Sequence, residues 1–171
     1  MDNLITGILI GAGTTIVGFL LTISWDIYKY NRDQNEKDKA VLRTLSLEIS
    51  ENKKTINQNE IAIEAELKVL DQNKSIISPL GLLNNNSWEF VKLNLPKKLI
   101  NDSTALEFVS EISKLIREVN GIISSRENYR INNEAMSNYS TRIGLYDNLI
   151  NSKQKELKTK LETDLPDIIS V

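Results

Sequence analysis

The 171-residue chain contains no cysteine and no histidine. The absence of cysteine excludes a disulfide framework and a thiolate nucleophile, and the absence of histidine excludes imidazole bases, Ser-His triads and the common zinc sites. We therefore expect no catalytic residue, no metal ligand and no cofactor-binding residue, and we predict that the protein is not an enzyme. An enzyme that uses carboxylates alone is the least favoured alternative.

Glycine and proline are also scarce, with seven and three residues, and the net charge is only −2. It contains no phosphate-binding glycine loop, no dinucleotide fingerprint and no EF-hand loop. Acidic and basic residues are dispersed, unlike the basic surface of a nucleic-acid-binding protein. We expect neither nucleic acid nor a small-molecule substrate as a partner.

The N-terminus carries a long uncharged segment. No charged residue lies between Asn3 and Trp25, where leucine, isoleucine, valine and phenylalanine dominate. About 20 apolar residues in a helix match the roughly 30 Å hydrocarbon core of a bilayer. The rings of Trp25, Tyr28 and Tyr30 follow at positions that favour the lipid headgroup layer. We therefore predict a transmembrane anchor over residues 1–25, with these aromatic residues as interface anchors.

The flanks of this segment favour a retained, single-pass anchor over a cleaved signal peptide. The residues before it include no lysine or arginine, and no Ala-x-Ala cleavage pattern follows it. Five basic residues come after it: Lys29, Arg32, Lys37, Lys39 and Arg43. By the positive-inside rule, we expect a cell-membrane protein with its N-terminus outside and its helical domain in the cytoplasm.

Small residues of the predicted anchor fall on about one third of the helix circumference. They are Gly7, Gly11, Thr14, Thr15, Gly18 and Thr22. The Gly7-x-x-x-Gly11 spacing lets two helix backbones approach closely in lipid. The stripe predicts a helix-packing face, for a second copy or for another protein. The alternative is that glycine is simply common in membrane helices.

Residues 26–40 are expected to form a helical connector, and residues 41–171 a cytoplasmic helical bundle. An apolar residue recurs every seven positions in Leu42, Ile49, Ile56, Ile63, Leu70 and Ile77. The second seam position is mostly polar, with Asn52, Asn59, Glu66 and Asn73. A two-stranded coiled coil prefers leucine there, so an intramolecular bundle is favoured over a zipper. Asparagine that fixes the register of an oligomer is the lesser alternative.

The later part of the chain predicts a short helix and two long ones. Pro79 and Gly81 end the first helix, and a short helix follows around Trp88. A long helix begins near Ser103, a polar stretch over residues 126–140 indicates a turn, and the last helix ends before Pro166. Short connections make successive helices antiparallel neighbours. We therefore predict an all-α fold, in which the anchor continues into an antiparallel three-helix bundle with a short helical cap at its far end.

Two sets of residues in the predicted bundle are candidates for special roles. Trp88 and Phe90 could form a recognition site, but burial at the distal end of the bundle is the favoured interpretation for the large indole. Asn52 and Asn120 could form a buried polar pair between the first and third soluble helices. The alternative is that both amides are solvated.

Three segments together resemble a recurrent pattern of uncharacterised single-pass membrane proteins of bacteria and archaea. They are Glu48-Ile49-Ser50-Glu51-Asn52, Asn86-Ser87-Trp88-Glu89-Phe90-Val91 and the helical stretch over residues 112–123. The resemblance implies an anchor, an acidic-asparagine helix, a capping segment and a further helix. That family has no assigned activity, so the resemblance implies architecture and membrane location but no catalytic residue.

These features favour a membrane-anchored helical interaction or scaffold module with no catalytic activity of its own. Its expected partners are the lipid bilayer and either an unidentified protein or a second copy, bound through the glycine face. The alternative is a self-oligomerising membrane-acting effector of the host-defence or phage-encoded kind.

Overall fold

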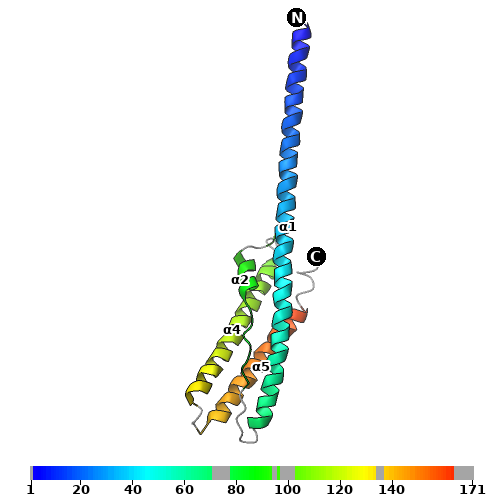
Figure 1. Cartoon of the computed structure of the whole chain (residues 1–171). Helices are drawn as coiled ribbons and strands as arrows, with labels where there is room; N and C mark the ends of the chain where they lie inside the picture. Colours follow the sequence, from blue (N-terminus) through cyan, green and yellow to red (C-terminus); the bar gives the residue numbers. More distant parts are fainter. Residues whose placement is uncertain (1, 71–77, 94–95, 97–102, 134–136, 164–171) are drawn as a thin grey trace. The chain divides into compact units, whose positions relative to one another are not determined.

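The computed structural model describes residues 2–70, 78–93, 96, 103–133 and 137–163, with their side chains from Val17 onward apart from that of Ser103. Within these ranges, all regular structure is helical and no strand occurs. The helices are α1 (Asp2–Leu70), α2 (Asn86–Leu93), α4 (Ser103–Asn133) and α5 (Tyr139–Thr163) (Figure 1). The prediction of an all-helical chain is confirmed for the described residues.

The chain divides into two compact units, Met1–Ala40 and Val41–Val171. The first unit contains the N-terminal part of α1, and none of its described side chains is buried. Within it, the rings of Trp25 and Tyr28 lie 5.9 Å apart, and the Thr22 hydroxyl donates a 2.9 Å hydrogen bond to the Gly18 carbonyl. The second unit contains the rest of α1 together with α2, α4 and α5.

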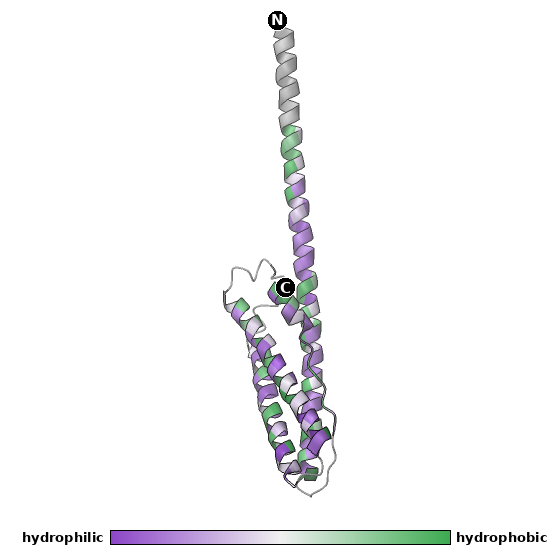
Figure 2. Ribbon diagram, turned by 90° about the vertical axis from the view of Figure 1, so that its left-hand side faces the viewer, coloured by the Kyte–Doolittle hydropathy of each residue, from purple (hydrophilic) through white to green (hydrophobic). Residues whose placement is uncertain are grey.

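The predicted fold is corrected in its transmembrane helix. Over the described residues, no helix is long and apolar enough to cross a membrane. The apolar stretch whose side chains are described extends only from Val17 to Trp25, and charged residues begin at Asp26 (Figure 2). A spanning helix needs about 20 predominantly apolar residues. The prediction depended mainly on residues before Val17, whose side chains lie outside the described part.

The core of the second unit forms along the apolar heptad column of α1. Five of its members are buried: Leu42, Ile49, Ile56, Ile63 and Leu70. Side chains of α4 and α5 complete the main cluster, including Ile112, Ile116, Val119, Ile123, Ile150, Leu157 and Leu161. A seven-residue repeat keeps one face of a helix turned to the same neighbours over successive turns. The column therefore sets which face of α1 contacts the other two helices.

Helix α4 runs parallel to α1, which corrects the predicted antiparallel topology. Arg126, late in α4, bonds Glu66 near the described end of α1, and at the other end of the bundle α2 contacts both Glu48 of α1 and Phe108 early in α4 (Figure 1). Helix α5 is antiparallel to α4, since Lys153 pairs with Glu118 and Lys160 with Glu111. The prediction assumed that a short connection joins neighbouring helices. Instead, residues 78–85 run back along α1 without helical structure, and α4 begins after them.

Helix α2 lies beside the first turns of the bundle and not at the far end, where the sequence predicts a cap. The Ser87 amide at its start bonds Glu48 of α1, and Trp88 contacts Phe108 of α4. The returning segment explains this position, because it carries the chain back to the starting end before α2 forms.

The polar stretch over residues 126–140, in which the sequence indicates a turn, is helical as far as Asn133, and the turn lies at residues 137–138 before α5 begins. Two of its asparagines satisfy carbonyls of their own helix: Asn132 donates to the Asn128 carbonyl, and Asn133 to that of Tyr129. Arg126, at the start of the stretch, is buried with Glu66 and Asp147 as its partners. Asn73 and Ile77, which the sequence places in the first helix, lie outside the described residues.

Candidate functional site: a polar column that binds an extended strap

The segment Ser78–Asn85, here called the strap, precedes α2 and has no regular secondary structure. Leu80 and Leu83 of the strap are buried in the core, whereas Leu82 is 58% exposed. A non-helical segment leaves its backbone amides and carbonyls without helical partners, and buried groups of this kind need partners elsewhere. The side chains of α1 and α4 supply them.

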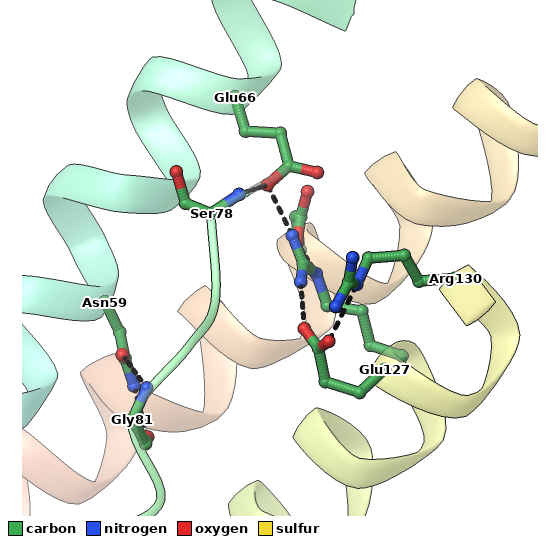
Figure 3. A network of polar contacts seen from close by, with 8 residues as sticks. Asn59, Glu66, Ser78, Gly81, Glu127 and Arg130 are labelled. Carbon is green, nitrogen blue, oxygen red and sulfur yellow. Dashed lines mark hydrogen bonds and ion pairs between the residues drawn. The ribbon is translucent and has the colours of Figure 1, made fainter. Parts of the chain in front are cut away.

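Three polar residues of α1, spaced seven apart, bind the strap backbone. Asn59 accepts from the Gly81 amide at 2.8 Å and donates to the Gly81 carbonyl at 2.9 Å. Asn52 makes the same two bonds to Asn84, each 2.7 Å long. Glu66 accepts from the Ser78 amide at 3.4 Å (Figure 3). We call these residues, together with Glu48, the polar column.

The spacing of these contacts follows from helix and chain geometry. Seven residues of an α-helix rise about 10.5 Å, and three residues of an extended chain cover about 10 Å. Each step of three residues forward along the strap matches a step of seven residues back along α1. The bonded pairs are Glu66 with Ser78, Asn59 with Gly81 and Asn52 with Asn84. An extended strap antiparallel to α1 therefore stays in register with a polar heptad position.

Asn120 of α4 binds the strap from its other side. Its amide accepts from the Leu83 amide and donates to the Leu83 carbonyl, both at 2.8 Å. The sequence predicts that Asn52 and Asn120 form a polar pair. Instead, Asn52 bonds Asn84, and Asn120 bonds the adjacent residue Leu83. The strap lies between them and links the two helices.

The start of α2 is fixed by Glu48, which accepts from the Ser87 amide at 2.7 Å. A carboxylate at a helix N-terminus satisfies a free amide and interacts favourably with the helix dipole. Glu89, one turn later, accepts from the buried Ser113 hydroxyl of α4 at 2.6 Å. This hydrogen bond is the main reason why the pKa of Glu89 is lowered. The charges of Lys92 and Arg117 and a hydrogen bond from Asn85 lower it further.

The strap backbone lies very close to α1 at Gly81. A Cβ atom built there would lie 2.8 Å from the Thr55 methyl carbon and 3.6 Å from the Asn59 amide oxygen. The first distance is shorter than a normal carbon–carbon contact of about 3.5–4.0 Å. Glycine therefore lets the strap backbone come close enough for Asn59 to bind it.

A buried ion cluster lies where the strap begins. The side chain of Arg126 in α4 is fully buried, and it bonds Glu66 of α1 at 2.5 Å and Asp147 of α5 at 2.6 Å. Glu127 bonds Arg126 at 2.8 Å and also Arg130 at 2.8 Å (Figure 3). The cluster joins the three long helices and, through Glu66, the first described residue of the strap.

Burial governs the electrostatics of this cluster. It raises the pKa of the Glu66 and Asp147 carboxyls above the usual range, because the attraction of Arg126 does not fully offset the loss of hydration. Burial also disfavours the charged guanidinium, but the carboxylates of Asp147 and Glu66 outweigh it and raise the pKa of Arg126.

The two aromatic candidates have different environments. Trp88 is fully buried, and its ring lies edge-on to Phe108 at 6.3 Å. Phe90, two residues later, is 51% exposed. Trp88 thus belongs to the core at the first turns of the bundle, whereas Phe90 lies on the surface of α2.

The candidates from the N-terminal segment belong to the first unit. The side chains of Gly7, Gly11, Thr14 and Thr15 lie outside the described part of the chain. Gly18 and Thr22 are exposed, and the space around a Cβ built on Gly18 is open. Trp25, Tyr28 and Tyr30 are exposed as well.

Sequence reasoning missed Arg126, Asp147 and the role of the polar column. The signal is nevertheless present, because Arg126 continues the apolar spacing of Ile116, Val119 and Ile123, and Asp147 lies between Ile143 and Ile150. A polar residue in an apolar helical series indicates either a break in the helix or a buried polar partner. At Arg126 the helix does not break, and the residue has buried polar partners instead.

Among the described residues, no group of three or more acidic side chains is placed to hold a metal ion. The chain matches no protein-family model, no curated protein and no solved structure. The resemblance to uncharacterised prokaryotic membrane proteins therefore stays a prediction from the sequence.

Proposed function

We propose that the protein is a helical interaction module that binds another protein and makes or breaks no covalent bond. The observation that carries the proposal is the surface formed by the strap and α2, which combines exposed apolar side chains with a tightly held backbone. Leu82 is 58% exposed, Phe90 51% and Leu93 83%. Phe90 and Leu93 are three residues apart on α2 and so share a face of that helix, and large exposed apolar side chains are typical of interaction sites.

The polar column supports this proposal because it fixes the backbone that carries these side chains. Gly81, Leu83 and Asn84 are each held through both amide and carbonyl, and Glu48 holds the first turn of α2. A surface that is already ordered loses less conformational entropy when it binds. The strap and α2 are therefore suited to present apolar side chains to a partner.

The use of the buried polar residues supports a non-catalytic role. Asn52, Asn59 and Asn120 bind the strap, and Arg126 binds both Glu66 and Asp147. An active site needs such groups directed into a cleft where a substrate can reach them. In this bundle they connect structural elements instead.

The proposal is tested by crosslinking in the native cells. A photoreactive residue is placed at Leu93 of the tagged full chain and, as a matched control, at Leu145, an exposed leucine of α5. We expect one protein species to be crosslinked from position 93 and not from 145, and Leu82→Ser to weaken that crosslink. Equal crosslinking from both positions, or none from position 93, would contradict the proposal.

The cell-membrane localisation and the glycine face stay predictions from the sequence, as does the alternative of a self-oligomerising effector. The interaction surface on the strap and α2 does not depend on them.

A further inference from the structure

The buried ion cluster has fewer positive than negative groups. Arg126 is the only cation among its fully buried members, and Glu66 and Asp147 share it. Glu127 and Arg130 are partly exposed at the edge of the cluster and are paired with each other. With both buried carboxyls ionised, the interior would hold one uncompensated negative charge, which is costly in a medium of low dielectric constant.

The hydrogen bonds of the two carboxyls show the same imbalance. Arg126 and the Ser78 amide bond one oxygen of Glu66, and Arg126 bonds one oxygen of Asp147. The second oxygens, Oε1 of Glu66 and Oδ2 of Asp147, are buried and have no hydrogen-bond partner among the described residues. An ionised carboxylate has room for several hydrogen bonds, and a buried oxygen without one is strongly disfavoured. A proton on one of these oxygens would remove the excess charge.

We propose that folding of the bundle captures one proton, which the Glu66 and Asp147 carboxyls share, so that mildly acidic conditions favour the folded state. The bond between Glu66 and the Ser78 amide connects this proton to the start of the strap.

Among the described residues, the groups that bond within the cluster come from four elements. Helix α1 contributes Glu66, the strap contributes the Ser78 amide, α4 contributes Arg126, Glu127 and Arg130, and α5 contributes Asp147. Burial raises the pKa of both Glu66 and Asp147, in agreement with the geometry. Because the two groups share one guanidinium, the proton belongs to the pair rather than to either residue.

The direction of the pH effect follows from the raised pKa values. At a pH between the ordinary carboxyl pKa near 4 and the raised pKa of the pair, the folded state holds a proton that the unfolded chain has released. The folded state therefore loses stability as the pH rises through this window. One proton corresponds to at most about a tenfold change in the unfolding equilibrium constant per pH unit.

The test measures urea unfolding of the full chain at several pH values between 5 and 8. We expect the unfolding constant of the unmodified protein to rise with pH, and this rise to be lost in both Glu66→Gln and Asp147→Asn. Glu64→Gln, at an exposed position of the same helix, is the matched control and should keep the rise. An unchanged pH dependence in both cluster variants would overturn the proposal.

Infrared spectroscopy of the folded protein provides a second measurement if either variant fails to fold. At mildly acidic pH, the stretching band of a protonated carboxyl group should be present in the folded unmodified chain and in Glu64→Gln. It should disappear after unfolding at the same pH. The absence of this band from the folded protein would contradict the proposal independently of any variant.

Discussion

Asn52 of α1 and Asn120 of α4 bind two consecutive residues of one extended segment. Each carboxamide makes a pair of hydrogen bonds to a single backbone unit, Asn52 to Asn84 and Asn120 to Leu83, at 2.7 and 2.8 Å. Successive residues of an extended chain point to opposite sides. Two parallel helices can therefore hold the chain from both sides, and the strap joins α1 and α4 as a strand would join its neighbours in a sheet.

The first prediction concerns this pair of bonds. Asn52→Ala removes both partners of the Asn84 backbone, and we expect it to lower the free energy of unfolding by about 2 to 4 kcal/mol, because two polar groups are left unsatisfied. Urea unfolding measures the loss, and hydrogen exchange at the Asn84 amide should become faster. Gln58→Ala, at an exposed position of the same helix, should change the free energy by less than about 0.5 kcal/mol.

The sequence predicts the helices of the bundle better than their arrangement. Apolar periodicity identifies the buried face of α1 and the start of α4 at Ser103, because these properties depend on local spacing. The parallel course of α1 and α4 depends on the strap, whose bonds join side chains to backbone groups. Backbone groups are the same at every residue, so no sequence pattern shows which residue of the strap Asn52 will bind.

The polar column shows how much of the site the sequence does contain. Asn52, Asn59 and Glu66 repeat every seven residues, and their polar character argues against a simple zipper. The same spacing matches three-residue steps of an extended chain, so it could have predicted a strap. Arg126 is harder to interpret, since its two carboxylate partners are 60 and 21 residues away in the sequence.

The second prediction concerns the close contact at Gly81. Gly81→Ala should lower the free energy of unfolding by about 1 to 3 kcal/mol, because the added Cβ overlaps the Thr55 methyl group at 2.8 Å. Thr55→Ser removes this methyl but keeps the hydroxyl, which donates to the Glu51 carbonyl. Thermal unfolding should therefore show that the double variant Gly81→Ala with Thr55→Ser recovers part of the loss.

A matched glycine substitution separates this contact from a general effect of alanine. Gly121 of α4 has nothing within 4 Å of its built Cβ atom. Gly121→Ala should be neutral or should stabilise the protein by up to about 1 kcal/mol, because alanine favours the helix. Equal losses at positions 81 and 121 would contradict the role assigned to Thr55.

The third prediction concerns the cation of the buried cluster. Arg126→Met leaves Glu66 and Asp147 without their counter-charge, and we expect a loss of about 3 to 5 kcal/mol in the free energy of unfolding at neutral pH. The loss should be smaller at mildly acidic pH, because both carboxyls have raised pKa values and become neutral by protonation. Urea unfolding at the two pH values measures the difference.

Arg130→Met is the control for this substitution. Arg130 is partly exposed and bonds only the edge residue Glu127 among the cluster's carboxylates. Exposed ion pairs contribute about 1 kcal/mol or less. A loss from Arg130→Met as large as that from Arg126→Met would show that burial of the guanidinium is not the cause.

The last prediction concerns Glu89, whose pKa is lowered mainly by the hydrogen bond from Ser113. Ser113→Ala removes this donor, so a carboxyl-detected NMR titration should place the pKa of Glu89 closer to its usual value than in the unmodified chain.

The lowered pKa of Glu89 also affects how the free energy of unfolding depends on pH. A lowered carboxyl pKa stabilises the folded state above the ordinary pKa, and this stabilisation is lost as the pH falls through the lowered value. Ser113→Ala should therefore flatten the acid limb of the stability profile, whereas Ser125→Ala, which removes only a bond to the Gly121 carbonyl of its own helix, should leave the pKa of Glu89 unchanged.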